Sequence, residues 1–247
     1  MRKVENIKYS KFDECVLDIY LPDEDSFSVF VYFHGGGLEA EDKSMADPIA
    51  KVLTQHKIAV VSANYRMYPT ASYPDFLRDG AAAVAWTREH ISEYGECNKI
   101  FVGGSSAGGY ISMMLCFDKK YLMTYGISPM DIDGFIHDAG QPTCHFNILR
   151  ERGMDPRRVI IDESAMIYHI GTEPKYPPML FVVSDNDMEN RYEQVMLAVS
   201  AIKSFGYDEP DLIVMHGEHC AYVVEIDEKE ECRFGYMVLE YIEKHNG

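Results

Sequence analysis

Basic residues are scarce in this chain relative to acidic ones, and the shortage narrows its possible partners. Of its 247 residues, 23 are lysine or arginine and 40 are aspartate or glutamate, which gives a formal net charge of −17. Such a surface repels nucleic-acid phosphates and anionic lipid headgroups. We therefore expect no nucleic-acid partner. The acidity is consistent with simple solubility or with a preference for neutral or cationic substrates.

Long apolar segments are also missing. Residues 1–20 alternate polar and apolar positions and contain no continuous apolar stretch of signal-peptide length. Nowhere does the chain approach the roughly twenty apolar residues that span a bilayer. We expect a cytoplasmic protein that does not contact a membrane.

Cysteines are few and scattered, with no C-x-x-C pair and no zinc-type grouping of cysteine with histidine. A chain of this length can bury a core without disulfides, so we expect free thiols, a reducing compartment and no metal site. The six are Cys15, Cys97, Cys116, Cys144, Cys220 and Cys232.

Hydrophobic periodicity predicts strands that alternate with helices. Strands are predicted at 16–21, 28–33, 58–63, 100–102, 135–137, 179–183 and 212–215. Helices are predicted at 75–94, 110–117, 192–205 and 228–245, with a short one near 164–170. This alternation favours a single α/β domain over residues 1–247, with a mostly parallel sheet covered by helices on both faces. The irregular stretch of about 138–178 is interpreted as a short cap insertion over the site.

The strongest chemical motif is Gly104-Ser105-Ser106-Ala107-Gly108, a G-x-S-x-G pattern between a predicted strand and a helix. In that context a sharp turn lifts the serine hydroxyl clear of the sheet, where it can act as a nucleophile. A tightly packed glycine turn or a phosphate site at the helix N-terminus is the alternative. A dinucleotide site is disfavoured because the spacing does not give G-x-G-x-x-G with an acidic residue about twenty positions later.

A second motif, His34-Gly35-Gly36-Gly37, follows a predicted strand and matches the H-G-G-G oxyanion pattern. Backbone N–H groups at such a turn stabilise the charge that develops on a carbonyl oxygen. The predicted donors are Gly35, Gly36 and Ala107, with Gly37 possible. A plain turn beside a buried histidine is the alternative, and the pairing with Ser106 favours the catalytic interpretation.

Together these motifs resemble the hormone-sensitive-lipase-like branch of the α/β-hydrolases, over about residues 28–224. The stretch Asn64-Tyr65-Arg66 also resembles that family, as does Asp79 in the following helix. The compact length is closer to bacterial acetyl and feruloyl esterases and to kynurenine-formamidase-like relatives than to lipases with large lids. The resemblance implies an α/β-hydrolase fold.

The family's order of serine, acid and histidine implies the two remaining catalytic residues. In Ser184-Asp185-Asn186-Asp187 the family spacing selects Asp187 as the acid, with Asp185 as the fallback. In His216-Gly217-Glu218-His219 it selects His219, because His216 follows the strand too closely to reach Ser106.

The resemblance thus implies a serine carboxylesterase that acts on short acyl esters, such as acetyl esters, through Ser106, Asp187 and His219, without cofactor or metal. Its partner would be a small-molecule ester, and a homo-oligomer is possible. Two alternatives stay open: an amide-cleaving relative, such as a formamidase or peptidase, and a catalytically inactive hydrolase fold that serves as a binding module.

Overall fold

An eight-stranded sheet runs through the computed structural model, which describes residues 1–226 and 232–246. The strand order is β1-β2-β4-β3-β5-β6-β7-β8. From β4 across to β8 neighbouring strands are parallel, whereas β1 pairs with β2, and β2 with β4, in antiparallel fashion. The strands are β1 (Arg2–Lys8), β2 (Val16–Leu21), β3 (Ser26–Phe33), β4 (Ile58–Ala63), β5 (Glu96–Ser105), β6 (Gly134–Asp138), β7 (Met179–Ser184) and β8 (Asp211–Met215). The predicted mostly parallel sheet is confirmed.

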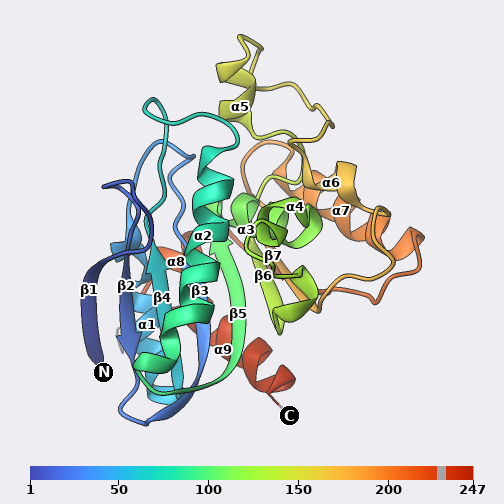
Figure 1. Cartoon of the computed structure of the whole chain (residues 1–247). Coiled ribbons are helices and arrows are strands. Elements are labelled where there is room, and N and C mark those ends of the chain that lie inside the picture. The colour runs from blue at the N-terminus through green and yellow to red at the C-terminus, as the bar shows by residue number, and fades with distance from the viewer. Residues whose placement is uncertain (227–231, 247) are drawn as a thin grey trace.

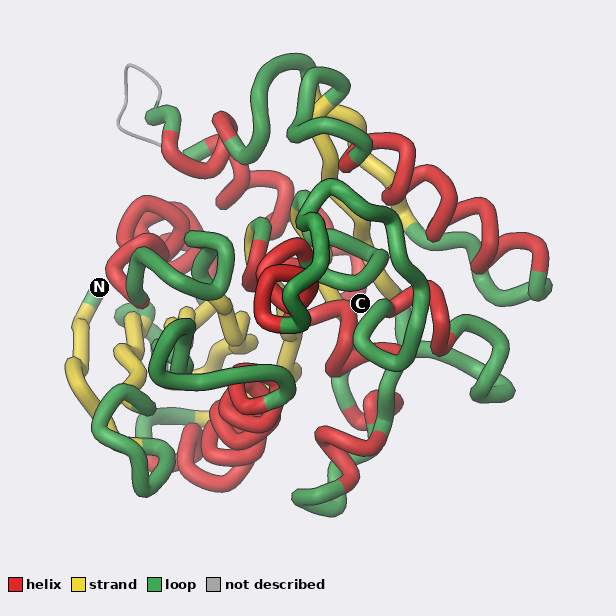
Figure 2. Tube along the Cα trace, turned by 90° about the horizontal axis from the view of Figure 1, so that it is seen from above, coloured by secondary structure: helices red, strands yellow, loops and turns green. Residues whose placement is uncertain are grey.

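Helices cover both faces of this sheet (Figures 1 and 2). Along β3, Val31 and Phe33 belong to one buried cluster and Phe30 and Tyr32 to the other, as the alternation of side chains in a strand requires. The first cluster includes α2 (Asp75–His90), α3 (Ala107–Phe117) and α7 (Arg191–Ser204). The second includes α1 (Asp47–Leu53), α8 (Ala221–Val224) and α9 (Arg233–His245). The short helices are α4 (Lys120–Met123), α5 (Phe146–Glu151) and α6 (Met166–His169).

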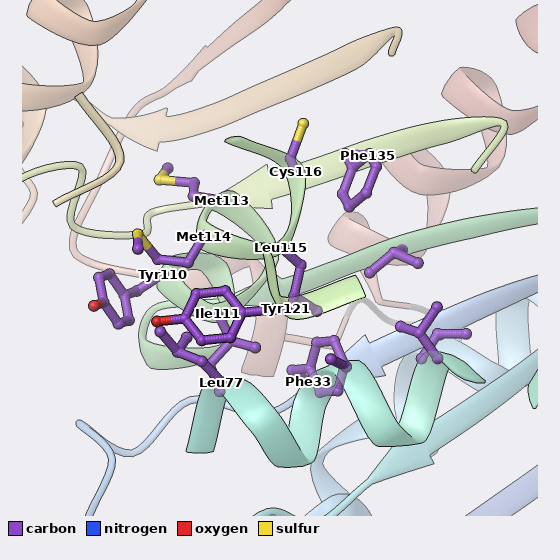
Figure 3. Close-up of a cluster of buried hydrophobic side chains, with 14 of the residues drawn as sticks. Phe33, Leu77, Tyr110, Ile111, Met113, Met114, Leu115, Cys116, Tyr121 and Phe135 are labelled. Carbon is purple, nitrogen blue, oxygen red and sulfur yellow. The ribbon is translucent and has the colours of Figure 1, made fainter. Parts of the chain in front are cut away.

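Helix α3 is buried along its whole length between the sheet and its neighbouring helices (Figure 3). A β-carbon on Gly80 of α2 would lie 2.8 Å from the Ile111 side chain, so the two helices approach closely at that glycine. Met113 and Met114 are fully buried here, as core residues are. Each such side chain contributes about 1.5–3 kcal/mol when it leaves water, so the helix that begins beside Ser106 is firmly held.

Several predicted bounds were wrong. The strand predicted at 100–102 runs from Glu96 to Ser105, because β3 and β6 pair with it on both sides and override its polar and glycine residues. The helix predicted from 110 begins at Ala107, since glycines 108 and 109 lie within its first turn. Helix α2 ends at His90 and is followed by a 3-10 turn, Ile91–Glu93, that completes the predicted segment. Helix α9 begins at Arg233, and the predicted residues 228–231 fall outside the described part of the chain.

Five elements, β1, α1, α4, α5 and α8, were not predicted. Strand β1 lies at the edge of the sheet and is mostly polar and exposed, and its pairing with β2 contains a register shift between Val4 and Ile7. Within residues 1–226 and 232–246, no helix has both the length and the apolar character that crossing a bilayer requires. All six cysteines are free thiols.

Candidate active site

Ser106 lies at the turn between β5 and α3 in a strained backbone conformation. Its φ of 54° and ψ of −111° are rare for a residue with a side chain. The Ser106 N–H donates to the carbonyl of Asp138 at 2.8 Å, which fixes the turn to the end of β6. A β-carbon on Gly108 would lie 1.9 Å from the Phe33 carbonyl oxygen, so only glycine allows this approach. The turn therefore holds the Ser106 side chain at the carboxyl edge of the sheet.

His219 and Asp187 come from the loops after β8 and β7 and meet at Ser106. The Nε2 atom of His219 lies 2.8 Å from Ser106 Oγ, and its Nδ1 atom lies 2.5 Å from Asp187 Oδ1. Asp187 has no exposed side-chain surface, and it also accepts from the Met188 N–H at 2.7 Å. In the tautomer that donates from Nδ1 to Asp187, Nε2 is free to accept the Ser106 proton. The structure therefore brings the three predicted side chains into one hydrogen-bonded row.

The fallback acid Asp185 and the rejected histidine His216 lie together elsewhere on the same two loops. His216 pairs with Asp185 through Nδ1, and 96 % of the His216 side chain is exposed. This pair faces solvent and does not contact Ser106. The loops themselves are joined, because Ser184 Oγ donates to the Glu218 carbonyl at 2.8 Å and the Asn186 N–H donates to Gly217 at 3.2 Å.

The glycine loop after β3 lies directly beside Ser106. A β-carbon on Gly35 would lie 3.5 Å from the Ser106 β-carbon. Gly36 has a φ of +85°, and a β-carbon there would lie 2.0 Å from the Ala40 carbonyl oxygen, so the turn excludes any side chain. Ala107 is the first residue of α3, and its N–H therefore has no carbonyl partner within the helix. The predicted donors Gly35, Gly36 and Ala107 thus border the serine from two segments.

Tyr65 holds the carbonyls of this loop, a role that the sequence did not reveal. Its hydroxyl donates to the His34 carbonyl at 2.8 Å and to that of Gly35 at 3.2 Å. The Tyr65 ring stacks on the buried His34 ring with centroids 4.4 Å apart. Burial lowers the pKa of His34 to about 4, so this imidazole is neutral and structural. Tyr65 belongs to the Asn64-Tyr65-Arg66 stretch, and the resemblance of that stretch to the family was the sequence signal that could have pointed to Tyr65.

Residues of the predicted cap insertion contact the other side of the same loop. Asn147 of α5 donates from Nδ2 to the Gly37 carbonyl. Its neighbour Phe146 comes within 3.2 Å of the position that a Gly37 β-carbon would take. Figure 1 shows α5 at the end of the molecule beyond α2 and α3. The insertion is anchored to the rest by the Tyr110 hydroxyl, which donates to the Ser164 carbonyl at 2.7 Å.

A second carboxyl group, Asp138, lies close to the row of Ser106, His219 and Asp187. It is fully buried at the end of β6, where the Tyr222 hydroxyl donates to Oδ1 and the Cys220 thiol lies 3.8 Å from Oδ2. Burial raises the pKa of Asp138 to about 6, although the nearby His219 opposes this shift. Nothing local in the sequence predicts Tyr222, 84 positions away, as the partner of Asp138.

Among residues 1–226 and 232–246, no three histidine, cysteine, aspartate or glutamate side chains are grouped as metal ligands. The site therefore consists of a serine hydroxyl with an adjacent imidazole and carboxylate, bordered by backbone amides.

Comparison with known families decides the assignment of the chain. The BD-FAE family matches residues 17–140, about half of the sequence, including the glycine loop and Ser106. The chain belongs to the BD-FAE family. Asp187 and His219 lie beyond the matched residues, so in this BD-FAE protein their relation to Ser106 rests on the coordinates.

The sequence of this BD-FAE protein is similar to those of several esterases. It is 34 % identical to carboxylesterase NlhH of Mycobacterium tuberculosis over 113 residues, 44 % of this chain and 35 % of that protein. It is 30 % identical to probable carboxylesterase 7 of Arabidopsis thaliana over 132 residues, 47 % of this chain and 42 % of that protein. The matches thus span less than half the length of these relatives.

Solved structures extend the likeness to the whole fold. Esterase B of Lactobacillus Rhamnosis superposes with a TM-score of 0.80 at 15 % identity, covering 99 % of this chain and 86 % of that one. Esterase Est2 of Thermogutta terrifontis superposes with a TM-score of 0.74 at 22 % identity, covering 96 % and 89 %. The BD-FAE protein therefore has the α/β-hydrolase fold that was predicted.

Proposed function

We propose that this protein is a serine carboxylesterase that hydrolyses short-chain acyl esters of small molecules, such as acetyl esters, without a cofactor. The observation that supports the proposal is the row Ser106, His219 and Asp187, with 2.8 Å between the hydroxyl oxygen and the imidazole and 2.5 Å between the imidazole and the carboxylate. A structural role alone would not require a buried carboxylate, an imidazole and a hydroxyl in this order.

His219 takes the Ser106 proton through Nε2 as the hydroxyl oxygen attacks the ester carbonyl, and then returns it to the leaving alcohol. Asp187 accepts from Nδ1, which keeps the ring in the required tautomer and stabilises the imidazolium that forms. The acyl group stays on Ser106 until a water molecule, activated by His219, releases the acid.

Negative charge on the carbonyl oxygen is stabilised by the N–H groups of Gly35, Gly36 and Ala107. Each such donor contributes on the order of 3 kcal/mol to the transition state. Little reorganisation of the loop is needed during the reaction, because the Tyr65 hydroxyl already holds the carbonyls of His34 and Gly35 in place.

The names of the relatives support an ester substrate, and the ligands bound to one solved structure support a short acyl chain. The curated relatives are named carboxylesterases and esterases, and Est2 of Thermogutta terrifontis has been solved with propionate and with butyrate bound. Short acyl groups are therefore the first substrates to test on this chain.

The test is hydrolysis of 4-nitrophenyl acetate, butyrate and octanoate by the wild type and by Ser106→Ala, together with labelling by a fluorophosphonate. We expect turnover that falls with chain length, and a loss on the order of 10⁴-fold or more, with no label, in the variant. The melting temperature should stay nearly unchanged. Less than a tenfold loss of kcat in folded Ser106→Ala would contradict the assignment.

The alternatives give different results in the same assays. N-formylkynurenine and a dipeptide amide measure amide cleavage, and a kcat/KM for either above that for the acetate ester would point to an amidase. Folded wild-type protein that neither turns over an ester or amide nor takes the label would point to a binding module.

A further inference from the structure

A cavity of about 250 Å³ lies beside the candidate active site, and the charge of its walls is opposite to that of the whole protein. Arg150, Arg157, Arg158 and Arg191 line it, against a single carboxylate, Glu189. The chain as a whole has 40 acidic and 23 basic residues. Four arginines at one small cavity in such a protein create a local positive potential, which attracts anions.

The cavity adjoins the catalytic groups on two sides. Met188, in its wall, follows Asp187 and donates its N–H to that carboxylate at 2.7 Å. Phe146, on another wall, touches the glycine loop at Gly37. The cavity wall therefore contacts both the carboxylate that pairs with His219 and the glycine loop beside Ser106.

Arg191 is the buried part of this wall. Only 4 % of its surface is exposed, and it donates from Nη1 to the Ala139 carbonyl and from Nη2 to Gln141 Oε1 at 3.4 Å. No aspartate or glutamate among the described residues forms an ion pair with it. Asp187 and Asp138 stabilise its charge electrostatically without forming an ion pair, and an anionic ligand in the cavity would stabilise this buried guanidinium by direct contact.

Carboxylates near the other arginines offset their charge only in part. Arg157 forms a forked ion pair with Asp155, while Arg150 reaches Glu39 only at 3.5 Å. Arg158 has no ion pair within the described residues and is exposed. It is thus available to a ligand that enters from solvent.

Helix α7 adds to the same potential. Its first residue is Arg191, whose N–H donates to the Met188 carbonyl at 2.9 Å, and Asn190 before it makes no side-chain cap bond. Asn190, Arg191 and Gln194 at this end of the 14-residue helix line the cavity. The N-terminus of a helix carries a partial positive charge that favours anions.

We propose that this cavity is a subsite for a carboxylate carried by the ester substrate, bound by Arg158 and Arg150 at the mouth and by Arg191 at the base. The inference rests on the proposed esterase function and narrows its substrate class to acidic esters. It reverses the preference for neutral or cationic substrates that the net charge of −17 suggested.

The kinetic test uses two matched pairs of esters. One pair carries the charge on the acyl side, 4-nitrophenyl hydrogen glutarate against 4-nitrophenyl valerate. The other carries it on the alcohol side, 4-acetoxybenzoate against its methyl ester. The readout is the ratio of kcat/KM for the anionic ester to that for the neutral ester, with rates in Ser106→Ala subtracted as background.

In at least one pair we expect this ratio to exceed one and to fall roughly tenfold in Arg158→Gln and in Arg150→Gln, as the loss of one charge-assisted hydrogen bond implies. Arg2→Gln is the matched control, since it removes the same charge from the exposed edge strand β1 and should leave the ratio unchanged. Ratios at or below one in both pairs, unaltered in the cavity variants, would overturn the proposal.

A binding measurement separates this proposal from the esterase itself. Ser106→Ala is titrated calorimetrically with glutarate and with 4-hydroxybenzoate, alone and combined with Arg158→Gln or Arg2→Gln. We expect at least one acid to bind, with a Kd weakened about tenfold only by Arg158→Gln. If the wild type hydrolyses none of the four esters, the esterase proposal fails, but this titration still tests the subsite. If neither acid binds, the subsite is rejected.

Discussion

Replacing Asp138 by asparagine should change how stability depends on pH. The carboxyl group is fully buried, and its folded-state pKa of about 6 is above the ordinary value of 3.8. The folded protein therefore holds a proton on this group over a pH range in which the unfolded chain has lost it. Consequently the contribution of Asp138 to stability is fully present below pH 3.8 and is lost as the pH rises toward about 6.

The size of the effect follows from the same two values. One pKa unit corresponds to about 1.4 kcal/mol, so the shift from 3.8 to about 6 makes the ionised group roughly 3 kcal/mol less favourable in the folded state. Asparagine keeps an oxygen that accepts from the Tyr222 hydroxyl and never ionises. Relative to wild type, Asp138→Asn should thus gain on the order of 3 kcal/mol in unfolding free energy between pH 4 and pH 8.

The assay is urea unfolding of both proteins at pH 4, 5, 6, 7 and 8, followed by fluorescence. Asp185→Asn serves as the control, because the His216 ring lowers the pKa of that exposed carboxyl and its contribution declines only as the pH falls below 3.8. Its difference from wild type should be nearly flat over the same range. A flat difference for Asp138→Asn as well, or one with the opposite slope, would refute the reasoning.

Three further substitutions test the site and its supports. Asp187→Asn should lower kcat/KM by on the order of 10⁴-fold, because the amide favours the wrong imidazole tautomer, whereas Asp185→Asn should lower it less than about threefold; the reverse order in ester hydrolysis assays would move the acid role. Gly108→Ala should destabilise the protein by at least about 2 kcal/mol in urea unfolding, since its β-carbon would lie 1.9 Å from a carbonyl oxygen of β3, and an unchanged midpoint would contradict this close approach. Asp79→Ala should cost about 3–5 kcal/mol in the same assay, because Arg66 donates to both Asp79 oxygens at 2.8 Å and would lose its partner; a cost below 1 kcal/mol would show that this buried pair is dispensable.

Much of the sheet could be predicted because its strands are continuous apolar runs. The bounds of β2 and β4 match the predicted residues 16–21 and 58–63. Strand β5 could not be bounded in this way. Its length comes from pairing with β3 and β6, and a β-carbon on Gly103 would lie 2.6 Å from the Ile136 carbonyl oxygen, a contact that no local pattern reveals.

The three predicted side chains were accessible to sequence reasoning because each follows a strand in a recognisable motif. The residues that support these three side chains could not be identified in this way. Tyr65 acts through carbonyls about thirty residues away, and Asp138 is matched with Tyr222 across 84 positions. The arginines of the cavity come from the insertion and from α7, on either side of β7, so that only the folded chain brings them together.

The bond from Ser184 to the Glu218 carbonyl joins the loop that carries Asp187 to the loop that carries His219. These two segments form one mechanical unit, although 34 positions separate the bonded residues. Anyone who transplants the loop after β7 from a related esterase into this chain should transplant the loop after β8 with it. A chimera that exchanges only one of them would lose the alignment of Asp187 with His219 even though both side chains are retained.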